Sequence, residues 1–146
     1  MICKARVLDA GRVGAILSEF NDTTDWMPRI HSRAEDISFA GEMIDRGWVD
    51  VFWADVLEDT KIAGFIARDG TMIHALYVTG SARQKGIGKA LLYHAKSISS
   101  ELTLWTFLAN QNAQRFYKNA GFIEIERTDG ANNDEKLPDM RLYWKR

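Results

Sequence analysis

The chain has 146 residues, and its 19 lysine and arginine residues nearly balance its 20 acidic residues, so the formal net charge is −1. A chain of this length can bury a hydrophobic core of its own, and we therefore predict a single domain over residues 1–146. The balanced charge excludes the strong positive field that nucleic-acid binding requires, so we expect no nucleic-acid partner.

The cysteine content and the first residues bear on the compartment. Cys3 is the only cysteine, which excludes an intramolecular disulfide and suits a reducing compartment. We interpret it as a small buried residue of a strand rather than as a nucleophile. Charges at Lys4 and Arg6 interrupt any apolar leader, and no apolar run has the length of a membrane span. We expect a cytoplasmic protein that has no membrane partner.

The first third of the chain predicts one strand and two helices. Residues 2–8 have a strand-like composition, and Asp9 is a candidate N-cap for the helix that follows. That helix is expected to end where turn-forming residues begin, over 21–31. Ser32 and Glu35 have the spacing of a capping box, which predicts the start of the second helix.

The remaining elements alternate between strands and helices. The second helix is predicted to stop at Gly47 and to bury Ile37, Ala40 and Ile44. Strands are predicted at residues 48–56, 61–68, 71–78, 102–107, 122–127 and 141–144, and helices at 88–99 and 112–120. Polar turns at 58–60 and 69–70 join the first three of these strands, so we expect an antiparallel meander.

This order of elements predicts the fold class. Strands and helices follow one another as β-α-α-β-β-β-α-β-α-β-β, which is typical of an α/β (α+β) domain. We expect a mixed, mostly antiparallel sheet of six to seven strands with helices on both faces. The polar and acidic stretch 128–139 is predicted to be a long loop before the last strand.

Residues 76–92 have the pattern of a strand, a loop and a helix. Apolar residues recur at helical spacing after Gly86 and Gly88. Glycine at a helix entrance lets the backbone come close to a ligand, and the free N–H groups of the first turn favour an anion. The loop also carries three cations, Arg83, Lys85 and Lys89.

The spacing of these glycines separates three phosphate-binding motifs. A P-loop, G-x-x-x-x-G-K-[ST], requires glycine where the chain has Arg83 and serine or threonine where it has Ala90. A dinucleotide fingerprint, G-x-G-x-x-G, that starts at Gly86 requires glycine where the chain has Leu91. The pattern that the chain contains is R-x-x-G-x-G, from Arg83 to Gly88.

With the preceding Leu76-Tyr77-Val78, this pattern resembles the acyl-CoA signature of the GNAT acetyltransferase superfamily. A second segment, from Asn110 to Phe122, is similar to that family's N-x-x-A-x-x-F-Y-x-x-x-G-F pattern. The two motifs occur in the family's order, and the predicted order of strands and helices is also the family's. The resemblance covers residues 60–127.

The resemblance implies acetyl-CoA as co-substrate, and no metal. In the family the fourth and fifth strands separate at their ends and the cofactor enters between them; here these are strands 71–78 and 102–107. The implied cofactor-binding residues are Leu76, Tyr77, Val78, Arg83, Gln84, Lys85, Gly86, Ile87, Gly88, Lys89, Asn110 and Asn112. A bulge around Tyr77 and Val78 would present a backbone N–H group to the acyl carbonyl.

Tyr117 occupies the tyrosine position of the second motif, which implies that its phenol donates a proton to the departing thiolate of CoA. Spacing alone favours an aromatic residue that packs, four positions after Ala113. Asn110 matches the family's asparagine that contacts the cofactor arm, and its alternative interpretation is a helix-start residue. The neighbouring Asn112 could take either role.

His74 is the candidate general base. It lies at even spacing from Met72 and Leu76, so the three share a face of the strand before any bulge. A histidine titrates near neutral pH, and the local sequence is similar to that of arylalkylamine N-acetyltransferases, where a histidine at this place helps to carry the proton away. Other family members place a glutamate two positions earlier, where this chain has Met72. A satisfied core histidine is the alternative interpretation.

Two loops are candidates for the walls of the acceptor site. The resemblance implies that the loop with Trp26 and Met27 forms one wall, although Trp26 could equally anchor that loop on the sheet. The loop 128–139 carries Asp129, Asp134, Glu135 and Asp139 against a single Lys136. A site between the two loops would favour a cation with an apolar body, whereas a solvated turn fits the same composition.

These residues predict an acetyl-CoA-dependent N-acetyltransferase that acts by direct transfer on a primary amine of a small molecule or peptide. The alternative from a different class is a CoA-binding or regulatory module without turnover. A different acyl group or a hydroxyl acceptor is a third interpretation. A candidate acid and base, Tyr117 and His74, favour the enzyme. A homodimer is compatible with the sequence.

Overall fold

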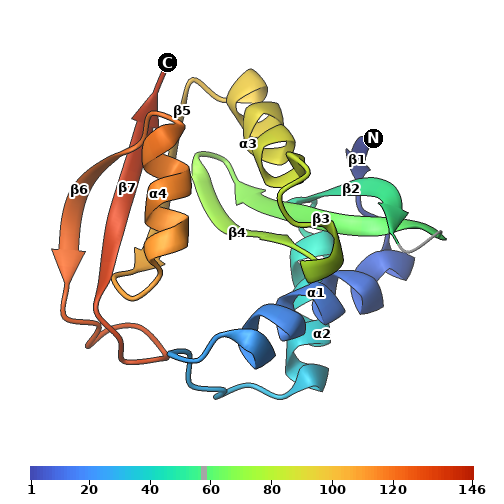
Figure 1. Cartoon of the computed structure of the whole chain (residues 1–146), viewed down its shortest axis with the longest axis horizontal. Helices are drawn as coiled ribbons and strands as arrows, with labels where there is room; N and C mark the ends of the chain where they lie inside the picture. The colour runs from blue at the N-terminus through green and yellow to red at the C-terminus, as the bar shows by residue number, and fades with distance from the viewer. Residues whose placement is uncertain (57–58) are drawn as a thin grey trace.

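The computed structural model of the protein describes residues 1–56 and 59–146; Glu58, which was expected in a turn, lies outside the described residues. A seven-stranded sheet has the order β1-β2-β3-β4-β5-β7-β6 (Figure 1). The strands are β1 (Ile2–Lys4), β2 (Val49–Val56), β3 (Asp59–Asp69), β4 (Met72–Val78), β5 (Glu101–Phe107), β6 (Ile123–Thr128) and β7 (Asp139–Lys145). The helices are α1 (Ala10–Thr23), α2 (Arg33–Asp45), α3 (Ile87–Ile98) and α4 (Gln111–Asn119), with short 3₁₀ turns η1 (Val7–Asp9) and η2 (Gly80–Ala82).

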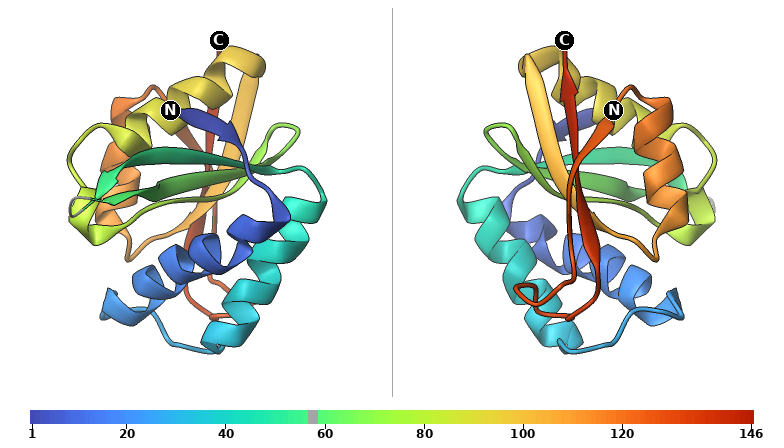
Figure 2. Two further views of the ribbon diagram at one scale, coloured as in Figure 1. Left: turned by 90° about the vertical axis from the view of Figure 1, so that its right-hand side faces the viewer. Right: turned by 90° about the vertical axis from the view of Figure 1, so that its left-hand side faces the viewer.

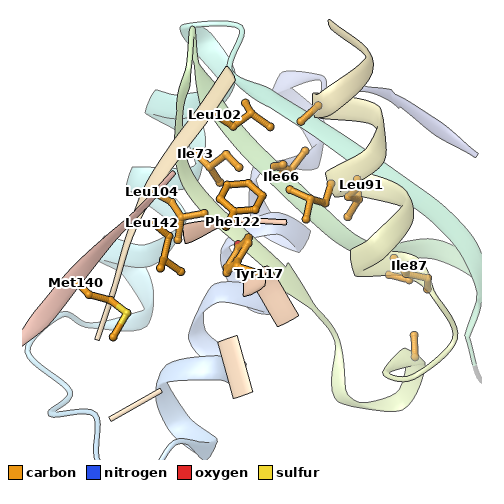
Figure 3. Close-up of a cluster of buried hydrophobic side chains, with 14 residues drawn as sticks. Ile66, Ile73, Ile87, Leu91, Leu102, Leu104, Tyr117, Phe122, Met140 and Leu142 are labelled. Atoms are coloured by element: carbon orange, nitrogen blue, oxygen red, sulfur yellow. The ribbon is translucent and has the colours of Figure 1, made fainter. Parts of the chain in front are cut away.

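Helices cover both faces of the sheet, as expected. One core forms where α1 and α2 pack on the meander around Phe65, and the other where α3 and α4 pack on the opposite face around Leu91 and Tyr117. Figure 2 shows α1 and α2 crossing together on one side of β2, β3 and β4, and Figure 3 shows the second core. Within the described residues, no helix has both the length and the apolar character to cross a membrane.

The sheet consists of two parts joined by a short parallel ladder. Strands β2, β3 and β4 form the predicted antiparallel meander, and β5, β7 and β6 pair antiparallel with one another. Between the two parts, β4 pairs with β5 only at Met72 with Thr103 and Ile73 with Leu104. Beyond Ile73 the two strands diverge toward their C-terminal ends, which leaves the facing edges of both strands without a strand partner (Figure 1).

Several predicted boundaries were wrong. The first strand ends at Lys4 rather than at residue 8, because the backbone turns into η1 and the N–H of Arg6 donates to the carboxylate of Asp9. This bond means that Asp9 does not cap α1 with its side chain. Asp59 and Thr60, both expected in a turn, belong to β3. The capping box of Ser32 and Glu35 is confirmed.

The helix face predicted for α2 is partly wrong. Ala40 and Ile44 are buried as predicted, whereas Ile37 is 43% exposed. The reason is the close crossing of α1 and α2, in which the main chain of Ile37 lies directly against Gly14. Both the main chain and the Cγ1 atom of Ile37 lie at this crossing, and the rest of the side chain is only partly covered there.

The β3–β4 ladder contains one irregularity, and it lies at His74. Ala67 pairs with Ala75, but the next residue, Arg68, pairs with Ile73. His74 is therefore an extra residue on β4, which is the definition of a β-bulge. A bulge re-aims the side chain of the extra residue and often occurs beside a functional site.

This bulge changes which side chains of β4 share a face. The ladder is regular at Tyr77 and Val78, so the bulge expected there was wrong. An extra residue shifts the alternation by one position. As a result, Leu76 packs with α3 and α4, while Tyr77 packs with α1 and α2. His74 opens on the α1 and α2 side, so the predicted common face of His74 and Leu76 does not exist.

The close α1–α2 crossing predicts how a substitution at Gly14 changes the stability of the protein. An added Cβ at Gly14 would lie 2.7 Å from the Cα of Ile37, so Gly14→Ala must push the helices apart. We expect it to lower the free energy of unfolding by about 1–3 kcal/mol. Gly11→Ala, whose Cβ would meet nothing within 4 Å on the same helix, is the matched control. It should be neutral or raise stability by up to about 1 kcal/mol.

Urea denaturation of the two variants measures this difference. Equal stability of Gly14→Ala and Gly11→Ala would contradict the close contact between the helices.

Candidate active site

The loop between β4 and α3 has the conformation of an anion-binding turn. Gly86 is the N-cap of α3 and has φ = +79°, and Gln84 has φ = +62°. A Cβ at Gly86 would meet no other atom within 4 Å, so glycine is required there by the backbone conformation and not by crowding within the protein. Gly88 has a different surrounding, since its Cβ would lie 3.6 Å from the ring of Phe116.

The N–H groups of this loop are not used in hydrogen bonds among the described residues. Ile87, Gly88 and Lys89 form the first turn of α3, and the first bond of the helix is from the N–H of Ala90 to the carbonyl of Gly86, 2.9 Å long. Across the part of the chain that the structure describes, no N–H of residues 84–89 donates to a protein acceptor. These groups and the helix dipole favour a bound anion.

The charged side chains of the loop surround this opening. Arg83, Gln84, Lys85 and Lys89 are exposed. The guanidinium of Arg83 donates to the carbonyl of Val78 at 3.3 Å, which holds it across the end of β4. Ile87 is one of the predicted cofactor-binding residues. Its side chain is buried in the core, so the residue can contribute only its N–H group.

Glu19 of α1 is a residue of the site that sequence reasoning missed. Its carboxylate accepts from the N–H of Gly80 at 2.7 Å and from the hydroxyl of Thr79 at 2.8 Å. These bonds attach α1 to the point where β4 turns into the anion-binding loop. No local pattern signals the contact, because Glu19 and Thr79 are 60 residues apart.

A slot lies in the gap between β4 and β5. It is a cavity of about 70 Å³, and five of the predicted site residues line it: His74, Leu76, Tyr77, Asn110 and Tyr117. Val78, at the end of β4, and Asn112 are not among its lining residues. The structure thus brings the candidate acid and the candidate base to one cavity.

Tyr117 is both a core residue and a slot residue. Its ring packs edge-to-face against Phe116 and Phe122, with ring centroids 5.1 Å and 5.3 Å away, as Figure 3 shows for Phe122. Burial, and to a lesser extent the nearby Tyr77, raises the pKa of Tyr117 above its usual range. The phenol therefore keeps its proton at neutral pH, as a general acid must.

Tyr77 separates the slot from a second cavity. Its ring packs on Phe20 at 4.7 Å and on Phe65 at 6.0 Å. Burial, and to a lesser extent the charges of Glu135 and Asp36, raises the pKa of Tyr77 to about 12. The phenol is neutral under ordinary conditions and forms part of an apolar wall.

The two asparagines have different surroundings. Asn110 is the N-cap of α4, where its side-chain oxygen accepts from the N–H of Ala113 at 3.1 Å. It also lines the slot, so both interpretations of this residue are compatible with its position. Asn112 is exposed and accepts from Arg115 at 3.4 Å, outside the slot.

The second cavity, called here the acceptor-side cavity, has a volume of about 350 Å³. It lies between β4 and the two N-terminal helices and is lined mainly by Leu17, Phe39, Met43, Trp48, His74 and Tyr77. His74 and Tyr77 line both cavities. His74 is exposed and stacks on the indole of Trp48, so it is not the satisfied core histidine of the alternative interpretation.

The two predicted wall loops meet each other. The imidazole of His31, between α1 and α2, lies 3.7 Å from the carboxylate of Asp134 in loop 128–139 (Figure 1). Trp26 packs edge-to-face on Phe107 at the end of β5, 5.7 Å between ring centroids, which makes it an anchor of its loop. Phe39 touches His31 and also lines the acceptor-side cavity.

The acids of loop 128–139 are used in two ways. Asp129 accepts from the N–H of Ala131, and the carboxylate of Asp139 accepts from Thr128 and Asn133, so these two acids build the loop. Asp134 faces His31, and the charge of Glu135 acts on Tyr77. Among the described residues, no three His, Cys, Asp or Glu side chains gather as a metal site.

An anion-binding loop, a gap between two parallel strands and a protonated tyrosine beside it together define a class of protein. The model of the acetyltransferase (GNAT) family matches residues 17–122, and the chain belongs to this family. The family expected from the two motifs is therefore confirmed.

Two curated relatives come from Escherichia coli. The chain is 36% identical over 92 residues to the peptidyl-lysine N-acetyltransferase YjaB, a match that spans 63% of each chain. It is 35% identical over 89 residues to the peptidyl-lysine N-acetyltransferase YiaC, over 60% of this chain and 59% of the relative. The sequence matches thus span about three fifths of the length of these relatives.

Solved structures match over nearly the whole chain. The solution structure of apo YjaB from Escherichia coli has a TM-score of 0.78 at 25% identity and covers 99% of this chain and 96% of that one. YncA from Salmonella typhimurium, solved with its cofactor acetyl-CoA, has a TM-score of 0.70 at 14% identity and covers 99% and 92%. These similarities confirm the predicted fold.

The buried phenols predict how stability depends on pH. The pKa values of Tyr77 and Tyr117 in the folded protein lie above the usual value of about 10, so their stabilising effect is complete below about pH 10. Above it the unfolded chain releases protons that the folded chain keeps, and the free energy of unfolding falls. Tyr117→Phe should reduce this slope by up to about 1.4 kcal/mol per pH unit.

Urea denaturation between about pH 8 and about pH 11 measures the slope. Tyr93→Phe, which changes an exposed tyrosine, is the matched control and should leave the slope unchanged. The same slope for Tyr117→Phe and Tyr93→Phe would show that Tyr117 is not buried.

Proposed function

We propose that the protein transfers an acetyl group from acetyl-CoA directly to a primary amine. The observation that carries this proposal is that the anion-binding loop, the slot and the acceptor-side cavity are connected through β4. The anion-binding loop follows the end of β4, whose residues Leu76 and Tyr77 line the slot, and the slot meets the acceptor-side cavity at His74 and Tyr77. A thioester and an amine that enter from the two sides would therefore meet beside a candidate base and a candidate acid.

The residues present fit CoA. The free N–H groups of residues 84–89 and the cations Arg83, Lys85 and Lys89 would bind its phosphates. Beyond Ile73, the edge of β4 that faces β5 has no strand partner, so those peptide groups of residues 76–78 that face this edge are available to the amide-containing arm. In this pairing, Leu76, Tyr77 and Val78 would bind the cofactor arm through their main chain and not through their side chains.

Each chemical step has a residue. His74 accepts the proton that the ammonium of the acceptor must lose before the nitrogen can attack. The C–N bond forms as the C–S bond breaks, and N–H groups of the β4 edge polarise the thioester carbonyl. Tyr117 donates its proton to the departing thiolate, and the proton that the nitrogen loses as the amide forms restores the phenol. No covalent enzyme intermediate is required.

The acceptor that the site fits best is a lysine side chain of a peptide. The lining of the acceptor-side cavity is mainly apolar, and Glu42 lies among it. Asp134 and Glu135 lie on the adjoining loop. An apolar stem that ends in an ammonium group matches this arrangement, and two relatives carry the name peptidyl-lysine N-acetyltransferase. A small-molecule amine is the second acceptor class. A reducing cytoplasm suits the single cysteine.

Release of free CoA from acetyl-CoA tests the proposal, with lysine peptides, small amines and aminoglycosides as acceptors. Tyr117→Phe should lower kcat more than it changes the KM for acetyl-CoA, because the proton is needed only as thiolate charge develops. His74→Ala should remove or shift the fall in rate at acidic pH. Saturable CoA binding without turnover on any acceptor would support a non-catalytic CoA-binding module instead.

Gly86 predicts the binding of CoA independently of turnover. Valine has no comfortable conformation at φ = +79°, so Gly86→Val should distort the anion-binding loop and weaken CoA binding at least tenfold. Gly70→Val introduces the same type of strain at φ = +58° in the β3–β4 turn and is the matched control. Calorimetric titration with CoA compares them, and equal affinities would contradict the assignment of the loop.

The acidic loop predicts acceptor preference. Replacing Asp134 and Glu135 by asparagine and glutamine should raise the KM for a cationic amine and leave that for acetyl-CoA nearly unchanged. The control is the same charge change at Asp69 and Glu126, two exposed acids on other parts of the surface. Identical KM values for the two double variants would remove this loop from the acceptor site.

A further inference from the structure

His74 differs from the other two histidines in what holds it. His31 lies within 3.7 Å of two carboxylates, and His94 lies 3.4 Å from Asp50. In the described part of the chain, the imidazole of His74 has neither an ion pair nor a hydrogen bond. Its neighbour is the indole of Trp48, with ring centroids 4.8 Å apart and planes inclined by 12°.

We propose that Trp48 is a positioning residue, which holds the imidazole of His74 in place over the acceptor-side cavity by stacking on its face. The proposal rests on the function proposed above, in which His74 is the base. Stacking has a chemical advantage over a hydrogen bond at this position. A hydrogen bond would occupy a ring nitrogen, whereas stacking uses only the face of the ring and leaves both nitrogens at the edge free for a proton.

The end of α2 holds the main chain of Trp48 in a fixed position. Gly47 has φ = +76° and donates to the carbonyl of Ile44 at 2.9 Å, and Trp48 donates to the carbonyl of Met43 at 3.1 Å. These two bonds form the Schellman motif that ends a helix at glycine. The carbonyl of Trp48 accepts from the N–H of Arg68 at 2.9 Å, which also attaches it to β3.

The bulge brings His74 to this platform. Arg68 is the residue at which the β3–β4 register shifts, so the strand that anchors Trp48 is also the strand against which His74 bulges. Without the extra residue, the alternation of β4 would continue unchanged to Leu76. The bulge and the helix end therefore act together to place one ring on the other.

The indole has a second contact, with a cation of α2. The guanidinium of Arg46 lies 5.0 Å from the centroid of the Trp48 ring, a cation–π distance. Glu42, one turn earlier on α2, pairs with Arg46 at 2.7 Å and holds it there. The indole thus contacts a guanidinium as well as the imidazole, and both contacts restrict its rotation.

A spectroscopic experiment tests the stack without reference to activity. In an NMR spectrum of the whole protein, the ring protons of His74 should be shifted upfield by the ring current of Trp48; His74→Gln identifies them. Trp48→Leu should abolish the shift, and Trp48→Phe should keep part of it. Trp53→Leu removes a different tryptophan, one that lies in β2 and lines neither cavity. This substitution should leave the His74 signals in place.

Kinetics on the same variants test the consequence. General-base catalysis contributes roughly 10²–10⁴-fold, so misorienting the base should lower kcat about tenfold or more in Trp48→Leu. The KM for acetyl-CoA should stay nearly unchanged, and Trp48→Phe should restore most of kcat. Trp53→Leu should retain the kcat of the parent.

Two results would overturn the proposal. One is a His74 spectrum that is the same in the parent and in folded Trp48→Leu. The other is a Trp48→Leu protein that loses the upfield shift but keeps the kcat of the parent. Failure of the proposed function is distinct from both, since the parent would then transfer acetyl to no acceptor. The NMR comparison would still decide whether Trp48 holds His74.

Discussion

The early end of the β4–β5 ladder is the constraint on which the site depends. Only two residue pairs join these parallel strands, at Met72 and Ile73, although on their other sides β5 is paired along its whole length and β4 at every residue except His74. Each of the two strands is therefore held by its own half of the sheet, and the halves can diverge. Unpaired peptide groups are costly unless they find partners, so the open edges favour a ligand with amide groups of its own. The slot is a consequence of sheet topology and not of any single side chain.

Packing and chemistry coincide at the bottom of this slot. Tyr117 fills the space that the diverging strands leave, and its ring is held by neighbours in the core. The burial that stabilises the ring also keeps the phenol protonated, because a phenolate would lose its solvation there. The two interpretations of Tyr117 that its spacing allows, packing and proton donation, are therefore compatible in one side chain.

Local sequence determined those features that depend on neighbours within one turn. The capping box of Ser32 and Glu35, the helix end at Gly47 and the left-handed entrance of α3 at Gly86 each follow from steric and hydrogen-bonding rules over a few residues. Hydrophobic periodicity also determined the order of the strands and helices. The two family motifs are short local patterns of the same kind. The family, the fold class and the anion-binding loop could therefore be predicted.

Only the tertiary structure decided how those pieces make a site. The bulge at His74 depends on the register between β3 and β4, and a shift of one residue reverses every later side chain. Glu19 reaches the loop from 60 residues away, and Trp48 meets His74 only because α2 ends where β3 and β4 lose register. Ile37 is partly exposed although it lies at the crossing of α1 and α2, where Gly14 lets the two helices approach closely. Such contacts join segments that are far apart in the chain, and local rules contain no information about them.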